Sequence, residues 1–252
     1  MIDTNVYLSR YPFRRLYGDE PSELLSTLRK NGIAQAWASS FDALLHRDLA
    51  AVNARLAEDC RRYSNGDLLP IGSVNPTAPD WREDLRRCIA EHRMQGLRLH
   101  PAYHGYGLDH PSLAELFGLA AERNIFLQIV CTMEDERTQH PLVKAAPVAL
   151  DPLPGALRRA PNLRVQLLNC RGGSPELLTA LALTQRAYSD FAMIEGVHGP
   201  ARWNAALGSD RVVFGSYSPF FYCEAAVLKV KEAGMDSKTL DQNAKRLLGA
   251  KR

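Results

Sequence analysis

The chain has 252 residues, of which 46% are hydrophobic and 23% are charged, as in an ordinary globular protein with a sizeable core. Its net charge of +3 is close to balance and its arginine pairs are dispersed, which argues against a nucleic-acid partner. No run of about 18 apolar residues is present to cross a membrane. The first expected strand begins at residue 1 and leaves no room for a signal peptide, so we expect a cytoplasmic protein.

Short apolar runs alternate with helical patterns almost to the end of the chain. Such runs are typical of parallel strands that helices cover on both faces, and they are residues 1–7, 33–39, 68–74, 96–100, 125–131, 163–169, 190–196 and 212–217. Polar caps and early prolines that begin helices occur at residues 19–22, 79–80, 110–112 and 174–175.

This alternation predicts a (β/α)8 TIM barrel that forms a single domain over residues 1–252. A doubly wound open sheet is the alternative, but the chain has no GxGxxG or GxxxxGK[ST] loop to support it. The five cysteines include no CxxC pair and are odd in number, which argues against a disulfide framework and a structural zinc site.

Barrel enzymes place their active sites at the carboxyl ends of the strands and on the loops that follow. The polar and aromatic residues that we expect there are Asn5, Tyr7, Trp37, Arg98, His100, His104, Glu134, Asn169, Arg171 and Tyr217, with Glu195 and His198 after the seventh strand. A cationic and aromatic lining of this kind predicts a small anionic or aromatic ligand.

Four motifs, in the correct order on the expected strands, resemble those of the amidohydrolase superfamily. IDTNVYLSRYPFR resembles I-D-x-H-x-H-L, and GLRLHP resembles G-x-K-L-H-P. LLNCRGG resembles a sixth-strand histidine followed by Gly-Gly, and FGSYSPF with the late NAKRLLG resembles G-S-D-x-P and a closing N-A-x-R-L. The resemblance is to the amidohydrolase-related group that includes metal-dependent decarboxylases and lactonases. It implies a hydrolase or lyase that acts on a small carboxylated compound, such as a lactone or an aromatic acid.

The chain departs from this family at the metal ligands. Asn5 and Tyr7 stand where the resemblance implies metal-binding histidines, IVCT lacks the fifth-strand histidine, Asn169 lies near the sixth-strand position, and Tyr217 replaces the eighth-strand aspartate. Amide oxygens and neutral phenols are poor substitutes for imidazole, carboxylate or thiolate ligands. We therefore expect no metal and no other cofactor at the family position.

One hypothesis is a metal-independent enzyme. His100 would act as general acid or base, Glu134 would add a catalytic carboxylate, and Tyr7 or Tyr217 would donate to an oxyanion. The residues expected to contact the substrate are Asn5, Trp37, Arg98, His104, Asn169 and Arg171. Structural roles compete with each assignment: His100 would bond a loop carbonyl, and the two tyrosines would fill the space left by the metal.

Two further hypotheses remain open. A relocated zinc would use His100 and His104 with nearby acidic residues or His198, although HPAYH is expected to be a loop without helical i, i+4 geometry. Alternatively, the chain is a non-catalytic small-molecule binder or a homo-oligomer subunit.

Cys131 and Cys170 end the fifth and sixth strands, where either is a candidate nucleophile, although Cys170 pointing into the barrel wall is the favoured interpretation.

Overall fold

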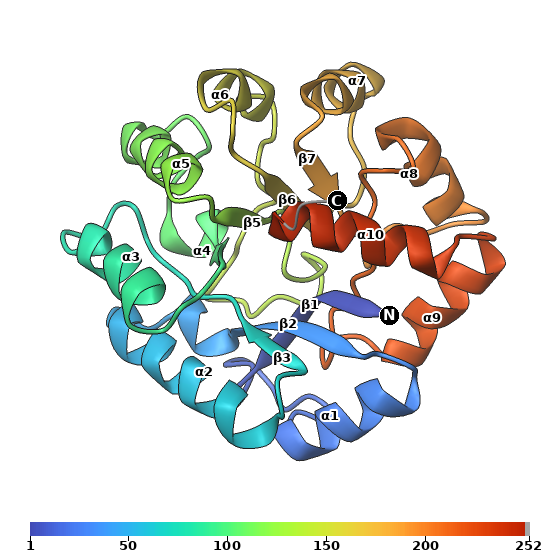
Figure 1. The fold of residues 1–252 in the computed structure, drawn as a ribbon, viewed down its shortest axis with the longest axis horizontal. Coiled ribbons are helices and arrows are strands. Elements are labelled where there is room, and N and C mark those ends of the chain that lie inside the picture. The colour runs from blue at the N-terminus through green and yellow to red at the C-terminus, as the bar shows by residue number, and fades with distance from the viewer. Residues whose placement is uncertain (250–252) are drawn as a thin grey trace.

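Seven short parallel strands form the inner wall of the protein in a computed structural model that describes residues 1–249 (Figure 1). They are β1 (Ile2–Leu8), β2 (Gln35–Ser40), β3 (Leu68–Pro70), β4 (Gly96–Leu99), β5 (Phe126–Val130), β6 (Val165–Leu168) and β7 (Ala187–Ser189). They pair in the orders β1-β2-β3 and β4-β5-β6-β7. Residues 250–252 of the expected domain lie outside the described residues.

Isolated bridges join these two sheets into a closed barrel. Gly72 pairs with Leu97 between the β3 and β4 sides. Residues 212–218 take the place of an eighth strand, because Val212 pairs with Ser189 and Ser218 pairs with Val6. The predicted (β/α)8 barrel is therefore confirmed, and the expected eighth strand lies in this segment.

The seventh strand is displaced from its expected position at residues 190–196. It lies at 187–189 instead, and the chain turns immediately after it. The carboxylate of Asp190 causes this turn, because it accepts hydrogen bonds from the backbone N–H groups of Asn169 (3.1 Å) and Ala192 (3.4 Å).

Helices surround the strands on the outside. They are α1 (Pro21–Lys30), the 3-10 turn η1 (Phe41–Leu44), α2 (Leu49–Tyr63), α3 (Trp81–Ala90), α4 (Pro101–His104), α5 (Pro111–Glu122), α6 (Leu153–Arg159), α7 (Pro175–Thr184), α8 (Gly199–Leu207), α9 (Cys223–Glu232) and α10 (Ser237–Leu248). The stretch HPAYH, expected to be a loop, contains the short helix α4 because Pro101 starts it and Gly105 ends it in the left-handed region. None of the helices within residues 1–249 has the length and apolarity that a bilayer span requires.

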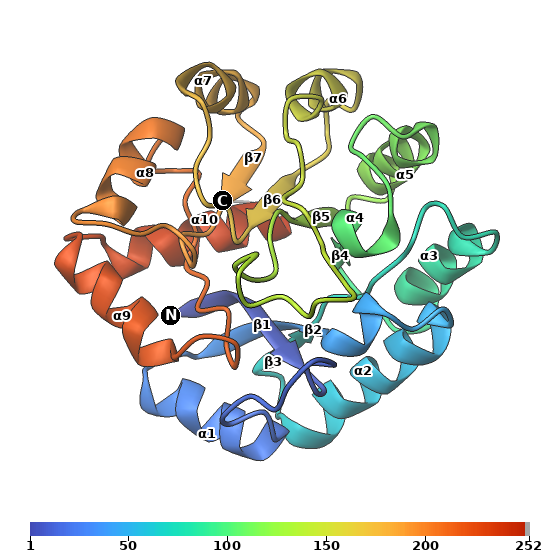
Figure 2. The same ribbon diagram turned by 180° about the vertical axis from the view of Figure 1, so that it is seen from behind.

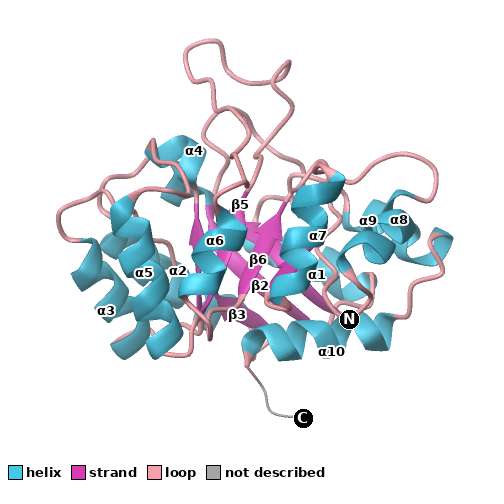
Figure 3. Ribbon diagram, turned by 90° about the horizontal axis from the view of Figure 1, so that it is seen from above, coloured by secondary structure: helices cyan, strands magenta, loops and turns pink. Residues whose placement is uncertain are grey.

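The two ends of the barrel are covered differently. Helix α10 lies across the end where the strands begin (Figures 1 and 3), and Ala244 and Leu247 pack there against a cluster that includes Trp37 and Phe126. Loops project from the other end, where the strands stop (Figure 3). The Trp37 ring therefore lies on the α10 side, against Phe126 at 4.9 Å, and not with the expected site residues.

The middle of the barrel is a buried polar belt, which we define as Thr4, Arg98, Gln128 and Gln166. The last three are in register on β4, β5 and β6. Arg98 Nε donates to Gln128 Oε1 (2.8 Å), Gln128 Nε2 donates to Gln166 Oε1 (2.8 Å), and Gln166 Nε2 donates to Thr4 Oγ1 (2.7 Å). Each polar group thus has a partner inside the barrel, as buried polar groups require.

Arg98 connects four strands. A bulge between Asp3 and Val6 presents the carbonyls of Thr4 and Val6 to the guanidinium, which donates to them at 3.3 and 3.0 Å. The guanidinium also lies over the Tyr7 ring, 4.4 Å from its centroid. Because Arg98 is fully buried and its donors are engaged, it holds the barrel together, and this corrects the expectation that it contacts a substrate.

Replacement of Arg98 with lysine is expected to destabilise the fold. Lysine keeps the charge but lacks the planar guanidinium, so buried carbonyl groups lose their hydrogen-bond donors. Each unsatisfied carbonyl costs about 1–3 kcal/mol, and we expect the free energy of unfolding to fall by roughly 2–4 kcal/mol. Urea unfolding would measure it. Arg137→Lys is the matched control, because the Arg137 side chain is 88% exposed and should change stability by less than about 0.5 kcal/mol. Equal stability of the two variants would contradict this role of Arg98.

Candidate active site

Three polar side chains, which we call the amide cluster, meet inside the barrel: Asn5 in the middle of β1, Asn169 directly after β6 and Asp190 directly after β7. Asn5 Nδ2 donates to Asn169 Oδ1 (2.8 Å) and to Asp190 Oδ2 (2.7 Å). All three are fully buried. Asn169 follows β6 in the left-handed region (φ 58°), a conformation that asparagine tolerates better than most residues. Residues that are far apart in sequence thus build one hydrogen-bonded site.

Burial changes the proton affinity of the carboxyl groups in and beside this cluster. Burial raises the pKa of Asp190 to about 7, although hydrogen bonds from Asn169 and Asn5 oppose the rise. Burial likewise raises the pKa of Asp3 to about 6, against the opposing hydrogen bonds of Ser216 and the Asn5 backbone. A carboxyl group that gains and loses its proton near neutral pH is suited to acid–base chemistry.

A second pair of groups, Tyr7 and His100, lies beside the amide cluster. The Tyr7 hydroxyl is 3.1 Å from His100 Nε2. Burial lowers the pKa of His100 well below its usual value, with help from the charges of His104 and Arg98, so the imidazole is neutral. Burial raises the pKa of Tyr7 to about 12. A neutral imidazole therefore faces a protonated phenol.

Several buried polar atoms at this end of the barrel have no partner among the described residues. They are His100 Nδ1, His104 Nδ1, Asn5 Oδ1 and Asn169 Nδ2. Buried polar atoms in native proteins nearly always bond to protein, water or ligand. Their gathering at the expected position of a barrel active site indicates that a polar ligand or ordered water completes the site.

The other expected residues, Glu134, His104 and Arg171, contact residues of the surrounding loops. Glu134 is buried and accepts hydrogen bonds from the Tyr11 hydroxyl (2.5 Å) and from Arg14 Nη1 (2.7 Å), so both of its oxygens are engaged. His104 Nε2 lies 2.8 Å from the Ala43 carbonyl oxygen. Arg171 is half exposed and contacts Asp135 at 3.4 Å.

The donors of a relocated zinc site are not brought together. His100 and His104 are neighbours, with ring centroids 5.8 Å apart, but Glu195 and His198 are exposed. Asp135 pairs with arginines. In the part of the chain that the structure describes, no group of three or more His, Cys, Asp or Glu side chains could hold a metal ion. The described residues therefore offer no preformed ligand set for the relocated zinc.

Aromatic rings close the barrel mouth above the polar groups. Tyr7 stacks on Phe41 with centroids 4.4 Å apart, Tyr217 stacks on Phe220 at 4.7 Å, and the two tyrosines meet edge to face at 5.9 Å. Residues 131–152, which we call the mouth loop, lie over the centre of the barrel (Figure 2). The Tyr217 hydroxyl donates to the Met133 carbonyl in this loop (2.6 Å). The mouth loop and these rings therefore cover the end of the barrel at which the amide cluster lies.

A cavity of about 420 Å³ lies at the rim of the mouth. Its lining includes Cys131, Thr132, Val148, Cys170 and Arg171. The volume suits a small molecule, and an arginine on its wall suits an anionic one.

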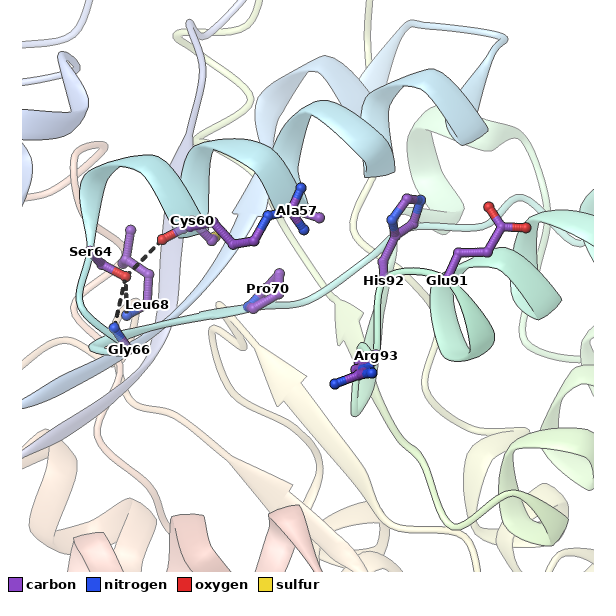
Figure 4. Close-up of a pocket in the computed structure, with 10 residues that line it drawn as sticks. Ala57, Cys60, Ser64, Gly66, Leu68, Pro70, Glu91, His92 and Arg93 are labelled. Atoms are coloured by element: carbon purple, nitrogen blue, oxygen red, sulfur yellow. Dashed lines mark hydrogen bonds between the residues drawn. The ribbon is translucent and has the colours of Figure 1, made fainter.

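A larger cavity of about 570 Å³ lies at the other end of the strands, beside Leu68 at the start of β3 (Figure 4). Ser64 there donates to the Cys60 carbonyl (2.8 Å). Because barrel active sites lie at the carboxyl ends of the strands, this second cavity is not the candidate site.

The comparison with known families fits this geometry. Residues 8–221 match the family profile described as Amidohydrolase. The chain belongs to the amidohydrolase family. No curated protein sequence matches this amidohydrolase.

Solved structures share its fold. 5-Carboxyvanillate decarboxylase from Sphingomonas paucimobilis has a TM-score of 0.74 and 16% identity, over 99% of this chain and 98% of the other. 2,6-Dihydroxybenzoate decarboxylase in complex with 2,6-dihydroxybenzoate has a TM-score of 0.72 and 14% identity, over 98% of each chain. Dihydroxybenzoic acid decarboxylase from Polaromonas sp. JS666, with bound manganese and the inhibitor 2-nitroresorcinol, has a TM-score of 0.72 and 13% identity, over 100% of this chain and 97% of the other.

The manganese in one relative raises the question of whether the amide cluster fits a metal. It does not fit. The amide nitrogen of Asn5 lies between Asn169 Oδ1 and Asp190 Oδ2, so N–H hydrogens occupy the space that a cation would share with these oxygens. Tyr7 stays protonated at neutral pH and is a poor ligand. Asp190 is the one carboxylate of the cluster.

Asp190 is the site residue that the sequence analysis missed. The strand was expected to begin at residue 190 and end near residue 196, so Glu195 and His198 were predicted at its carboxyl end instead. The signal that could have located Asp190 is a short strand with few β-branched residues that ends in Ser189 and is followed directly by an acidic residue. An aspartate directly after a barrel strand is placed at the active-site end.

The raised pKa of Asp190 predicts that stability depends on pH. The folded protein holds this proton more tightly than the unfolded chain, so the stabilisation is full below pH 4 and is lost as the pH rises through about 7. From pH 5 to pH 8 the wild type should lose about 2–3 kcal/mol more than Asp190→Asn, which does not ionise. Urea unfolding at several pH values would measure this difference. Asp151→Asn, at an exposed position, is the control, and parallel profiles for wild type and Asp190→Asn would refute the assignment.

Proposed function

We propose that this amidohydrolase is a lyase that removes the carboxyl group of a small aromatic acid without a catalytic metal. The observation that carries the proposal is the amide cluster, a buried proton-holding carboxyl group at the end of a barrel whose fold relatives include aromatic-acid decarboxylases. The unpartnered polar atoms beside it would complete their hydrogen bonds with the substrate.

The amide cluster suits the proton step of such a reaction. When an aromatic acid loses carbon dioxide, the bond from the ring to the carboxylate breaks, and its electron pair stays at the ring carbon, which takes up a proton. Asp190, with its pKa raised to about 7, holds a proton near neutral pH and would donate it there. Asn5 and the Asn169 backbone hold its two oxygens in place.

A cation at the rim of the barrel mouth favours an anionic substrate. Arg98 lies deeper in the barrel, where the largely ionised Asp3, with a pKa raised only to about 6, offsets its charge at neutral pH. Arg171 adds a cation at the rim cavity. A substrate carboxylate would therefore be attracted towards the mouth.

His100 and Tyr7 would recognise a hydroxyl group on the aromatic ring. Nδ1 of His100 has no partner among the described residues and is available to a substrate hydroxyl, whereas Nε2 contacts the Tyr7 hydroxyl. The surrounding rings of Phe41, Tyr217 and Phe220 would pack on the substrate once the mouth loop opens. Closure of the loop would then exclude water from the proton transfer.

Decarboxylation can be tested directly on hydroxybenzoic acids. We expect carbon dioxide release, with one solvent deuteron entering the ring when the reaction runs in D2O. Asp190→Asn should lower kcat by about 100-fold or more, the usual size of a general acid–base contribution. His100→Gln should mainly raise KM, because it removes a contact with the ring hydroxyl. Glu195→Gln, at an exposed position, should retain wild-type activity. Unchanged turnover in Asp190→Asn would remove this residue from the mechanism.

Metal content tests the metal-free part of the proposal. Protein purified without chelators, and again after incubation with zinc or manganese, should hold far less than one metal ion per chain by plasma mass spectrometry, because the donor set lacks three ligands. Treatment with EDTA should leave decarboxylation unchanged. About one tightly held metal per chain, together with activity that EDTA removes, would show that the reaction depends on metal.

A non-catalytic binder is the second candidate, and the aromatic closure of the mouth favours it. Such a protein would bind a hydroxybenzoate at the rim cavity without releasing carbon dioxide. Calorimetric binding that Arg171→Gln weakens, combined with no turnover at any pH, would favour this function over the lyase.

A further inference from the structure

Cys131 and Cys170 lie side by side at the carboxyl ends of neighbouring strands. Val130 of β5 is paired with Leu168 of β6, and the Cys131 N–H donates to the Leu168 carbonyl (2.9 Å), so the two chains are still adjacent where the cysteines occur. Both side chains line the rim cavity of about 420 Å³. Each thiol donates to a carbonyl oxygen of its own chain segment, Cys131 Sγ to Ile129 (3.6 Å) and Cys170 Sγ to Gly172 (3.7 Å).

The other cysteines have different surroundings. Burial is the main influence on Cys60, Cys88 and Cys223, and no second thiol contributes to their raised pKa values. Cys60 and Cys223 also line cavities. What sets Cys131 and Cys170 apart is that two cysteines line the same cavity from neighbouring strands.

We propose that Cys131 and Cys170 form an intramolecular disulfide when a hydroperoxide enters the rim cavity. One thiolate attacks a peroxide oxygen, the O–O bond breaks, and a sulfenic acid and water (or an alcohol) form. The second thiol then attacks this sulfur, the S–O bond breaks, and water leaves. Two sulfur atoms are oxidised, one peroxide is reduced, and the protein loses two hydrogen atoms.

The disulfide would act on the base of the mouth loop. Cys131 is the first residue of this loop, and its carbonyl accepts a hydrogen bond from Val148 N near the other end (2.9 Å). Cys170 directly follows Asn169 of the amide cluster. The cross-link would therefore tie both ends of the mouth loop to the end of β6. This modification is independent of the proposed decarboxylation.

The rate of oxidation should depend on pH in a defined direction. The neighbouring Cys170 thiol and burial raise the pKa of Cys131 well above its usual value, so little thiolate exists at pH 7. Because the thiolate is the nucleophile, oxidation should be slow at neutral pH and should accelerate above about pH 9.

The test is peptide mapping of the wild-type protein without reductant after exposure to hydrogen peroxide at increasing pH. We expect one cross-linked peptide pair that joins Cys131 to Cys170, forms faster at higher pH and disappears with dithiothreitol. No such pair at any pH, irreversible oxidation of either cysteine alone, or a cross-link to a different cysteine would overturn the proposal.

Matched variants separate this pair from general thiol oxidation. Cys170→Ser should abolish the cross-link and leave a sulfenic acid at Cys131 that dimedone traps, whereas Cys60→Ser should form the cross-link at the wild-type rate. The wild-type map decides the question even if a variant folds poorly. Cross-linking that persists in Cys170→Ser would also overturn the assignment.

Discussion

The structure depends on a cation buried in the middle of the barrel. The Arg98 guanidinium has no carboxylate partner among the described residues, and it is held by the carbonyls of Thr4, Val6 and Trp37 and by Gln128. A charge without such donors and acceptors would be expelled from an apolar core. The bulge in β1 is the local adjustment that turns two of these carbonyls inward. The position of β1, and with it of every site residue on that strand, follows from this arrangement.

The loop-covered end of the barrel is built upon this belt. Tyr7 lies over the guanidinium with one face and stacks on Phe41 with the other, so its hydroxyl has one direction, towards His100. Tyr217 is held in the left-handed region (φ 61°) by its backbone bond to the Asn5 carbonyl and its hydroxyl bond to Met133. A bulky residue is rarely found there, and such strain gathers at functional sites. The mouth loop and Tyr217, which its hydroxyl bond links to Met133 of that loop, together cover the amide cluster.

Much of the fold could be predicted from the sequence, because buried parallel strands need long apolar runs and barrel helices need caps. The alternation of these patterns along the chain is sufficient for a (β/α)8 barrel. The residues of the candidate site were harder to predict from the sequence than the fold. The roles of Trp37 and Arg98 depend on which layer of the barrel each side chain enters, and the partners that fix this layer are distant in sequence, such as Phe126 for Trp37 and Gln128 for Arg98. Asp190 was missed because β7 is only three residues long and its apolar pattern continues past its end.

The amide cluster shows how a barrel of this family can hold a buried carboxyl group with amide donors at its strand ends. A metal would hold nearby carboxylates ionised and bring charge to the strand ends. Here the neutral Asn5 amide bridges Asn169 and Asp190 with N–H donors, and burial keeps the pKa of Asp190 near neutral. A bound cation would keep the Asp190 carboxyl group ionised, whereas here Asp190 can carry a proton near neutral pH. In the proposed function, these hydrogen bonds would hold Asp190 for proton transfer at the loop-covered end of the barrel.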